Sequence, residues 1–508
     1  MISLRNIRFP VAQQYDLKSE ISKKLKISGS AFEIIEISRR AVDCRRKNQP
    51  VYDFSAVLDI STLNHPDASP WIEPQQPDTD PIYLNDKHPF IIGMGPAGLF
   101  CALEMVENGL EPWLFDMGGD LESRASDVNG FWQGGELKPG SNVQFGEGGA
   151  GAFSDGKLTS RARDWAVRRV FDRFIEHGAE PSISYEALPH LGTDGIRNVV
   201  RSIREYLISK GCKFQYHHKL EELRLENGKV TKLVINSMEY QPETVILALG
   251  NSSRETFRML VREGVRIEAK PFAVGFRVEH EQAFIDRAIY GSDKWGSILG
   301  PATYRLACGD TYSFCMCPGG FVINAASEPG TVVTNGMSFS GRDNCLANSA
   351  IVSVVNETDY GQGVFAGVDF QEQLERSAFK DGYHAPAQKV KDYKQDKLST
   401  SVIKTSFTPE VYSRKLSTLI PQAVDSRIKI ALHKFDTIIR DFSRDAVFIA
   451  PETRTSSPVR ILRHEERGHC SGVKNLYAIG EGSGYAGGII SSAADGLRLG
   501  MRLKLEKY

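Results

Sequence analysis

A glycine motif between two short apolar runs constrains the fold of this chain more than any other feature. The first run leads into Gly93-Met-Gly95-Pro-Ala-Gly98, a helical pattern follows, and the second run ends at Asp116. This order predicts a βαβ unit. Its first glycine permits the tight turn, its second lets a pyrophosphate approach the backbone, and its third lets helix and strand pack closely.

The acidic residue at the end of the second predicted strand adds a ligand to this pattern. Asp116 lies 23 positions after Gly93, where a carboxylate can accept hydrogen bonds from the hydroxyls of an adenosine ribose. The N-terminus of the helix faces the phosphates with free N–H groups and a favourable dipole. We therefore predict a bound dinucleotide; the alternative is an ordinary glycine-rich turn in an α/β sheet.

The elements after this unit favour an FAD domain over a plain NAD domain. A helix is predicted over Ile196 to Ser209 and a strand over Lys213 to His218. An Asn227-Gly228 turn indicates a hairpin, and Thr244 to Leu249 reads as a buried strand. An antiparallel meander before a returning buried strand is typical of FAD-binding Rossmann variants, whereas an NAD domain would continue with further α/β units.

Two further glycine-rich segments extend the predicted cofactor site. The first, Gly130 to Leu158, can wrap a flat ligand; a flexible surface loop is the alternative. The second, Gly480 to Gly488, follows a buried strand and precedes a predicted helix from Ile489 to Leu503. The N-terminus of that helix can face the edge of a flavin, although the same pattern also fits a glycine turn without a ligand.

These patterns divide the chain into an α/β protein of several units. We predict a small N-terminal α+β, ferredoxin-like module with its linker at residues 1–80. The FAD-binding Rossmann-type domain is expected in two parts, residues 81–250 and 451–508. An α+β substrate domain is expected between them, at residues 251–450. The proline-rich stretch from Asn64 to Asp86 is predicted to be the linker.

Charge and cysteine usage restrict the partners and the compartment. The 62 basic and 63 acidic residues give a net charge of −1, so no global field attracts nucleic acid or membrane. The polar N-terminus and the lack of a run long enough to span a bilayer predict a cytoplasmic protein. Eight cysteines without a C-x-x-C pair predict reduced thiols and no metal site. A local basic run reads either as a solvated face or as a site for an anionic partner such as RNA; it comprises Arg39, Arg40, Arg45, Arg46 and Lys47.

Several longer motifs resemble a known family. They are the glycine motif and Asp116, the runs 142–151 and 153–157, Cys315-Met-Cys-Pro-Gly-Gly320, Glu452-Thr-Arg-Thr-Ser-Ser-Pro458 and Gly480-Glu-Gly-Ser-Gly-Tyr-Ala-Gly-Gly488. Together they resemble the uncharacterised bacterial FAD-dependent dehydrogenases, which are related to glutathione-reductase-like flavoproteins. The resemblance implies one FAD per chain, with Arg124 near the phosphates. The cofactor-binding residues that we expect are Gly93, Gly95, Pro96, Ala97, Gly98, Asp116, Arg124, Gln144, Gly148, Gly149, Gly250, Gly480, Glu481, Gly487, Gly488 and Ile489.

The substrate side is less defined, and no catalytic residue is assigned. Lys157, Cys317 and Arg454 are candidate substrate residues. Cys315 and Cys317 would share one face of a strand, where they can form a thiol pair or serve as small buried hydrophobes, and strand geometry opposes an easy disulfide. Arg454 can clamp a carboxylate or phosphate, or form a salt bridge. Candidate acid/base groups are His190 and His384.

These observations predict an FAD-dependent oxidoreductase that transfers hydride or electrons between flavin and an unidentified organic substrate. The later runs with the same glycine spacing, Gly146 to Gly151 and Gly482 to Gly487, are assigned to the FAD site, so no dedicated nicotinamide domain is expected. NADH, NADPH or a protein would then act as a transient reductant. The alternative is an RNA-acting or partner-binding flavoprotein that uses the basic N-terminal module.

Overall fold

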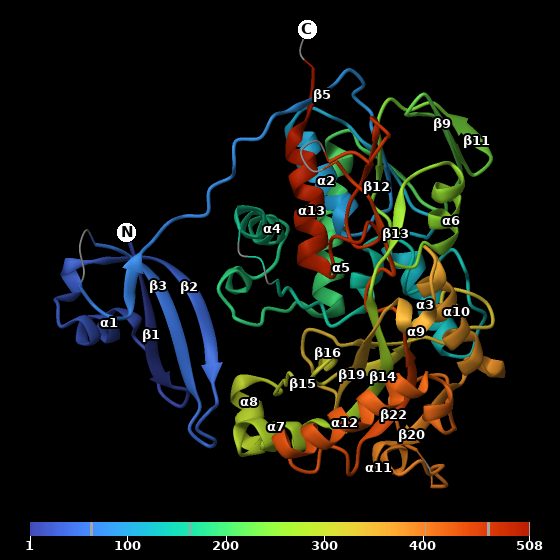
Figure 1. Ribbon diagram of the computed structural model, residues 1–508. Helices are drawn as coiled ribbons and strands as arrows, with labels where there is room; N and C mark the ends of the chain where they lie inside the picture. Colours follow the sequence, from blue (N-terminus) through green and yellow to red (C-terminus); the bar gives the residue numbers. More distant parts are fainter. Residues whose placement is uncertain (61–63, 161, 163, 402, 465–467, 507–508) are drawn as a thin grey trace.

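The N-terminal module stands beside a larger body built from two sheets (Figure 1). The computed structural model describes residues 1–60, 64–160, 162, 164–401, 403–464 and 468–506. No described helix is long and apolar enough to cross a membrane. The fold is a mixed α/β architecture, as the sequence predicts.

A five-stranded parallel sheet forms the first half of the body. Its order is β24-β12-β6-β7-β8, so strands from both ends of the chain meet in one sheet. Strands β24, β12 and β6 are completely buried, as expected for a parallel sheet covered on both faces. The bounds are β6 (Phe90–Ile92), β7 (Trp113–Phe115), β8 (Lys213–Gln215), β12 (Val245–Leu247) and β24 (Leu476–Ala478).

Two helices that are far apart in sequence pack closely on this sheet. Helix α2 (Pro96–Glu107) follows the glycine motif, and α13 (Ile489–Arg502) follows the second glycine turn. A Cβ atom at Gly496 would lie 2.0 Å from the Ala97 carbonyl oxygen, so only glycine permits this approach. The two helices lie side by side in Figure 1, and a Cβ atom at Gly480 would lie 2.6 Å from the Ala97 Cβ, so the two glycine turns are neighbours.

An antiparallel meander follows the parallel sheet, where the sequence predicts it. It consists of β9 (Leu220–Glu226), β10 (Lys229–Ile235) and β11 (Met238–Tyr240). Asn227 and Gly228 both have positive φ, which is the conformation that a type I′ hairpin turn requires. The predicted hairpin is present.

A seven-stranded sheet forms the second half of the body. Its order is β15-β16-β19-β14-β22-β20-β21, and all pairs are antiparallel except β20 with β21. Its strands are β14 (Phe272–Glu281), β15 (Ala307–Cys308), β16 (Thr311–Cys317), β19 (Leu346–Val355), β20 (Ala385–Lys389), β21 (Val411–Ser413) and β22 (Val447–Glu452).

The remaining elements connect or cover these two sheets. The helices are α3 (Leu121–Trp132), α4 (Trp165–Glu176), α5 (Gly192–Ser209), α6 (Arg254–Arg262), α7 (Gln282–Tyr290), α8 (Gly296–Leu299), α9 (Glu357–Tyr360), α10 (Ala366–Ala378), α11 (Val390–Lys394) and α12 (Gln422–Ile438). Short strand pairs are formed by β13 (Ile267–Ala269) with β23 (Val459–Ile461), and by β17 (Phe321–Asn324) with β18 (Thr334–Met337).

The N-terminal module is a four-stranded sheet with one helix. Its elements are β1 (Ile2–Pro10), α1 (Leu17–Leu25), β2 (Glu33–Asp43), β3 (Val51–Asp59) and β4 (Ala68–Pro70), in sheet order β2-β3-β1-β4. Asp16 caps α1, as its position predicts. A ferredoxin-like β-α-β-β-α-β unit has a second helix before its last strand. The described residues between β3 and β4 contain no such helix, so the module is a reduced version of the predicted unit.

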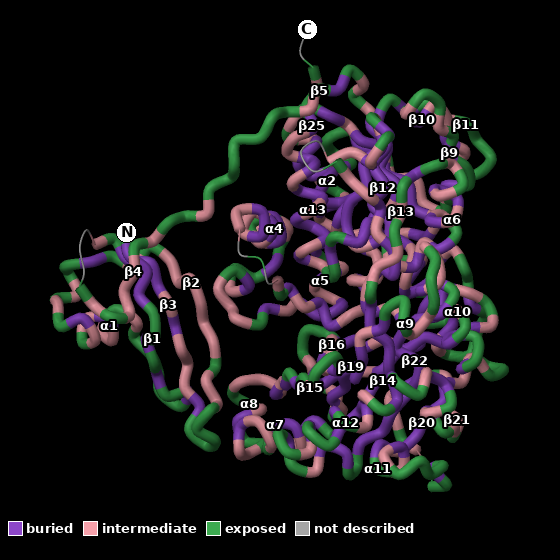
Figure 2. The backbone as a smooth tube through the Cα atoms, in the orientation of Figure 1, coloured by how far each residue is buried: buried purple, intermediate pink, exposed green. Residues whose placement is uncertain are grey.

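The predicted linker is shorter than the proline-rich stretch suggests. Strand β4 pairs with β1, and β5 (Ile82–Leu84) pairs with β25 (Leu503–Leu505) at the other end of the chain. The extended connection therefore covers only residues 71–81, which are largely exposed (Figure 2). Three-residue strands whose partners are distant leave no apolar period in the sequence, so the prediction was wrong at both ends.

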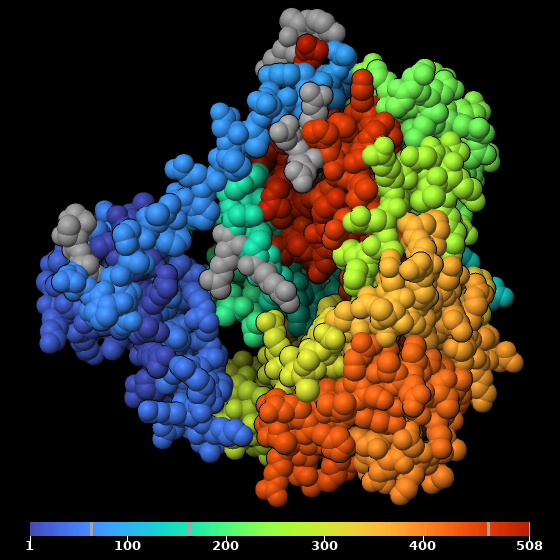
Figure 3. Space-filling model, viewed as in Figure 1, coloured from blue at the N-terminus to red at the C-terminus, as the bar shows by residue number. Residues whose placement is uncertain are grey.

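The module contacts both halves of the body. Arg40 binds Glu186 through its side chain, and its backbone N–H donates to the Tyr185 carbonyl oxygen. At the other end, the Asn48 N–H donates to the Tyr290 carbonyl oxygen at 2.8 Å. Figure 3 shows the module seated against the body at its lower edge.

Candidate cofactor and substrate site

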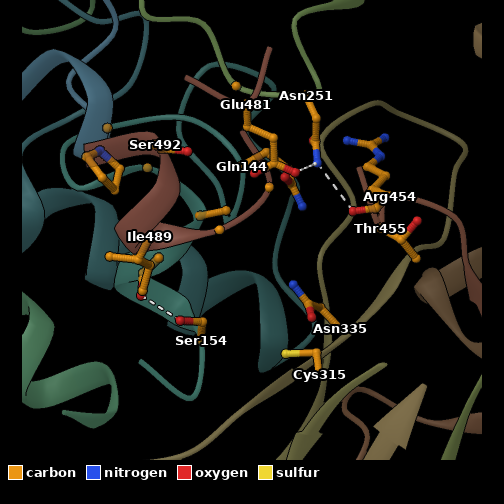
Figure 4. Close-up of a pocket in the computed structure, with 18 of the residues that line it drawn as sticks. Gln144, Ser154, Asn251, Cys315, Asn335, Arg454, Thr455, Glu481, Ile489 and Ser492 are labelled. Atoms are coloured by element: carbon orange, nitrogen blue, oxygen red, sulfur yellow. Dashed lines mark hydrogen bonds between the residues drawn. The ribbon is translucent and has the colours of Figure 1, made fainter. Parts of the chain in front are cut away.

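One large cavity lies between the parallel sheet and the seven-stranded sheet. Its volume is about 910 Å³, within the size range of cofactor and ligand pockets. All three glycine-rich segments contribute to its wall, together with residues 303–316 of the other half (Figure 4). The cavity therefore joins the predicted cofactor site to the predicted substrate domain.

The first glycine motif has the geometry that its sequence predicts. Gly93 has φ +113°, and a Cβ atom there would lie 2.3 Å from the Ala248 carbonyl oxygen. A Cβ atom at Gly98 would lie 2.1 Å from the Gly93 carbonyl oxygen, so this glycine allows the helix to approach the strand. At Gly95 a Cβ atom meets only Gly149, at 3.8 Å, and points to the cavity side. The cradle thus leaves room for a pyrophosphate at Gly95.

Asp116 is fixed at the cavity wall by two backbone donors. Its Oδ2 accepts a hydrogen bond from the Met94 N–H, and its Oδ1 accepts one from the Gly118 N–H, each at 2.9 Å. The carboxylate is buried but lines the cavity, beside His218 and Leu220. This is the position in which an acid can bind an adenosine ribose.

Arg124 acts on the glycine-rich loop and does not line the cavity. Its guanidinium is completely buried and donates to the carbonyl oxygens of Asn142, Val143 and Glu147 at 2.8, 2.8 and 2.6 Å. Burial lowers the pKa of Arg124 to about 9, although the nearby Asp116 opposes this shift. The guanidinium therefore lies behind the loop and holds it in shape, and its place near the phosphates of a bound FAD stays a prediction.

The second glycine turn presents open backbone and a helix N-terminus to the cavity. No atom lies within 4 Å of a Cβ atom built at Gly487 or Gly488, and Ile489 begins α13 directly after them. All three line the cavity. Gly480, by contrast, lies behind the wall, where a Cβ atom would come within 2.6 Å of the Ala97 Cβ.

Glu481 carries a half-buried carboxylate at the same wall. Burial raises its pKa to about 7, although the hydrogen bond from the Asn251 side chain (2.9 Å) lowers it. Asn251 also donates to the Arg454 carbonyl oxygen at 3.3 Å (Figure 4). The carboxamide thus links the second glycine turn to the segment that carries Arg454.

The other predicted cofactor residues fall into two groups. Pro96, Ala97, Gln144, Gly149 and Gly250 line the cavity. Gln144 is held by the Ser252 hydroxyl, which donates to its Oε1 at 3.1 Å. Gly148 and Gly98 do not line the cavity and allow close backbone packing behind it.

Lys157 lines the opposite side of the cavity. Its ammonium lies 3.1 Å from Asp155 Oδ2 and donates to the Met316 carbonyl oxygen. Burial alone would lower the pKa of Lys157, but the neighbouring cysteines and Asp155 raise it. Asp155 also binds Arg342, so one buried carboxylate holds two cations at the wall.

The cysteine pair differs from the prediction. A regular strand would turn both side chains to one face, but β16 contains a bulge between Phe314 and Cys317. Cys315 lies in this bulge with φ +44° and lines the cavity, whereas Cys317 is buried behind it. The predicted substrate residue Cys317 therefore does not reach the cavity, and its neighbour does.

Arg454 lines the cavity, but its guanidinium is already engaged. It forms hydrogen bonds with both oxygens of Glu375 and with the hydroxyl of Ser252 at 3.1 Å. Its side chain is 4% exposed. This is the salt bridge that the sequence left as the alternative, and a substrate contact of Arg454 stays a prediction.

The two candidate histidines do not line the cavity. His190 Nε2 lies 3.3 Å from the Ser340 carbonyl oxygen, and burial lowers the pKa of its ring. His384 lies beside Gly382 at the end of a short turn. Within the described part of the chain, no group of three or more His, Cys, Asp or Glu side chains is arranged to hold a metal ion.

Sequence patterns missed several residues of the wall. Ser154, Asn251 and Asn335 point to the cavity in Figure 4, and residues 303–307 form part of its substrate side. Ser154 lies within the run 153–157, whose resemblance to the family could have indicated it. Asn335 lies on β18 of the short β17–β18 pair, and residues 303–307 lead into β15 of the seven-stranded sheet. Both stretches lack a motif, because only the fold brings them to the cavity.

Two sequence comparisons identify proteins that are similar to this chain. Residues 271–455 match the family described as FAD-dependent protein, C-terminal domain-like. A protein of Clostridium beijerinckii, described as an uncharacterized protein, is 39% identical over 532 aligned positions that cover 100% of this chain and 99% of the other.

The solved structures that match this chain have low sequence identity and low TM-scores. Glycine oxidase from Geobacillus kaustophilus has a TM-score of 0.36 at 10% identity, over 80% of this chain and 92% of the other. Tetracycline destructase Tet(55) has a TM-score of 0.35 at 10% identity, over 82% and 79%. CtdE in complex with FAD and substrate 4 has a TM-score of 0.32 at 10% identity, over 82% and 79%.

Proposed function

Because this chain belongs to one family with the clostridial protein and carries the C-terminal domain of FAD-dependent proteins, we propose that it is an FAD-dependent oxidoreductase. FAD is its cofactor. The finer part of the proposal is a dehydrogenase or reductase of the kind related to glutathione-reductase-like flavoproteins. Its substrate would be a small organic molecule.

One observation carries this proposal: a single cavity contains both the glycine cradle and a wall from the second sheet. The open backbone at Gly95, Gly487 and Gly488 fits a flat dinucleotide, and Asp116 fits its ribose. Bound flavin supplies two-electron chemistry and accepts or donates hydride. The protein must then hold a substrate against it and keep water away.

The second-sheet side of the cavity is suited to that task. It combines the apolar side chains of Leu306 and Phe314 with the ammonium of Lys157. An apolar wall excludes water, and the cation favours a substrate with a carbonyl or carboxylate oxygen near the ring. Lys157 is held by Asp155, so its position is fixed before a substrate enters.

The test starts with the purified chain. We expect a yellow protein that releases FAD on denaturation, with one FAD per chain. Mixed anaerobically with NADH or NADPH, the bound flavin should bleach if a nicotinamide is the reductant. A slow or absent reaction with both would indicate a protein reductant, and a colourless chain that does not bind added FAD would contradict the proposal.

A second candidate is an RNA-acting or partner-binding flavoprotein. Arg39, Arg45 and Lys47 line a cleft of about 620 Å³ between the module and the second half of the body. Arg45 is partly neutralised by Asp43, and Arg40 is used in the contact with the body. RNA binding through this cleft would weaken steeply with salt. If the chain shows no salt-dependent RNA binding, the result favours the oxidoreductase over this second candidate.

A further inference from the structure

The bulge in β16 places a cysteine where glycine is favoured. Strand β16 pairs regularly with β19 as far as Phe314 opposite Ala350, and pairing resumes with Cys317 opposite Asn348. Cys315 and Met316 therefore face a single position of β19, and Cys315 takes φ +44°. A bulge of this kind redirects a side chain, and glycine is the residue that usually adopts the left-handed conformation there.

The strain at Cys315 is located at the cavity. Among the described non-glycine residues with positive φ, the two that line the cavity are Cys315 and Arg342. Left-handed backbone at a residue with a Cβ atom costs free energy, and such residues gather at functional sites. Glycine would satisfy the backbone of this bulge better than cysteine. What cysteine adds is a thiol at the cavity wall.

The second thiol lies directly behind the first, between two cations. Cys317 Sγ lies 3.3 Å from the Cys315 carbonyl oxygen, 3.8 Å from Arg277 Nη2 and 4.0 Å from Lys157 Nζ. Arg277 is completely buried, and its Nε and Nη1 have no hydrogen-bond partner among the described residues. A buried guanidinium without full compensation favours negative charge on a neighbouring sulfur.

The charged groups around the pair act together on the Cys315 thiol. The hydrogen bond from the Cys317 thiol, followed by the charges of Lys157 and Arg277, lowers the pKa of Cys315 to about 5, against the effects of burial and Asp155. The same coupling raises the pKa of Cys317. One sulfur is thus a thiolate at neutral pH and the other keeps its proton, which is the arrangement of an attacking thiol and a resolving thiol.

We propose that Cys315 and Cys317 are a redox-active thiol pair that exchanges one electron pair with the bound FAD. In the oxidising direction the Cys317 thiol gives up its proton, an S–S bond forms with the Cys315 thiolate, and FAD takes up the two electrons and this one proton to become FADH−. The reverse step breaks the S–S bond and restores the Cys315 thiolate, the Cys317 thiol and FAD. The proposal rests on the proposed function, because it requires bound FAD.

Thiol counting is the first test, and it does not depend on turnover. The sequence contains eight cysteines. A chain purified in air and unfolded without reductant should show two fewer thiols than the same chain after reduction. The missing pair should appear in the peptide that contains Cys315 and Cys317, with a mass lower by two hydrogens.

Anaerobic titration with dithionite is the second test. The wild-type chain should take up twice as many electrons per bound FAD as the Cys317→Ser variant, because the variant retains the flavin alone. Cys315→Gly should behave like Cys317→Ser and should fold well, since glycine relieves the left-handed backbone. The matched control is Cys308→Ser on the neighbouring strand β15, which should titrate like the wild type.

The outcomes separate this proposal from the proposed function. Equal thiol counts before and after reduction, or equal electron uptake by wild type and Cys317→Ser at full FAD content, overturns the thiol pair and leaves the flavoprotein assignment intact. Loss of FAD from the wild-type chain itself would instead contradict the proposed function. Iodoacetamide provides an independent readout: in the reduced chain Cys315 should be alkylated well below the pH of about 8.5 at which free cysteine ionises, and Lys157→Met should shift that midpoint upward.

Discussion

Glu375 binds Arg454 with both of its carboxylate oxygens, from Nε to Oε1 at 3.1 Å and from Nη2 to Oε2 at 2.9 Å. The same carboxylate accepts hydrogen bonds from Arg254 at 2.7 and 2.9 Å. Burial would raise the pKa of Glu375, but the two guanidinium groups lower it to about 2. This buried node ties α10 of the second half to α6 and to the wall of the cofactor cavity.

The node makes a stability prediction for Arg454. Arg454→Ala removes a charge-assisted pair, so we expect the free energy of unfolding to fall by about 1.5 to 3 kcal/mol. Urea unfolding of the flavin-loaded wild-type and variant chains measures this change in the free energy of unfolding. The control is Arg258→Ala in the exposed pair with Asp369, which should cost less than about 1 kcal/mol. An unchanged unfolding free energy, with weaker substrate binding and full FAD content, would return Arg454 to the role of substrate clamp.

Gly95→Leu is expected to lose the flavin and keep the fold. The backbone at Gly95 has φ −76° and ψ −176°, which any residue can adopt, and the new side chain would enter the space of the pyrophosphate. Flavin absorbance per chain and the far-ultraviolet circular dichroism measure the two effects. Full flavin absorbance in this variant would remove the basis for the cofactor site.

Two other glycines provide controls for that experiment. Gly98→Ala should destabilise the chain itself, because its Cβ atom would lie 2.1 Å from the Gly93 carbonyl oxygen. Gly130→Ala, with no atom within 4 Å of the new Cβ, should leave both flavin content and stability close to the wild type.

The sequence predicted the elements that have strong local signals. The glycine motif, the Asn227-Gly228 turn and the Asp16 cap each depend on a few adjacent residues, and each is found where the pattern places it. The wall of the cavity depends on contacts between distant segments. No sequence pattern shows that Arg124 donates to the carbonyl oxygens of the glycine-rich loop, or that a bulge in β16 separates the side chains of Cys315 and Cys317.

Removal of residues 1–80 is expected to leave a folded, flavin-loaded chain. The truncation ends before β5, which pairs with β25, and the cofactor cavity contains no residue of the module. Flavin absorbance and size-exclusion chromatography measure the result, and Arg40→Ala in the full chain is a milder test of the contact with Glu186. An insoluble or flavin-free truncation would mean that the module is part of the core.

Treatment with a chelator should not alter the flavin chemistry. No described cluster of side chains is arranged for a metal ion, and the residues around the cavity offer glycine backbone, the ammonium groups of Lys157 and Lys219, and paired carboxylates. Rates of flavin reduction and reoxidation should therefore be the same before and after dialysis against EDTA. A loss of either rate that added divalent metal restores would contradict this expectation.

Glu452 gives a prediction for the dependence of stability on pH. The side chain is buried at the cavity wall, 3.5 Å from Arg277 Nη1, and burial raises its pKa to about 7 despite that cation. The folded chain therefore binds this proton more tightly than the unfolded chain, whose carboxyl titrates near pH 4.5. The protonated Glu452 carboxyl therefore makes its full contribution to the free energy of unfolding below about pH 4.5, and this contribution is lost as the pH rises to about 7.

Glu452→Gln keeps the shape of the neutral acid and removes the titration. Relative to the wild type, the variant should gain stability between about pH 5 and pH 8, by up to about 3 kcal/mol, because one unit of pKa shift corresponds to about 1.4 kcal/mol. Urea unfolding at both pH values measures this gain. Glu255→Gln, at an exposed carboxylate, is the control and should show no such change. A difference between Glu452→Gln and wild type that does not vary with pH would show that Glu452 is already ionised in the folded chain at about pH 5.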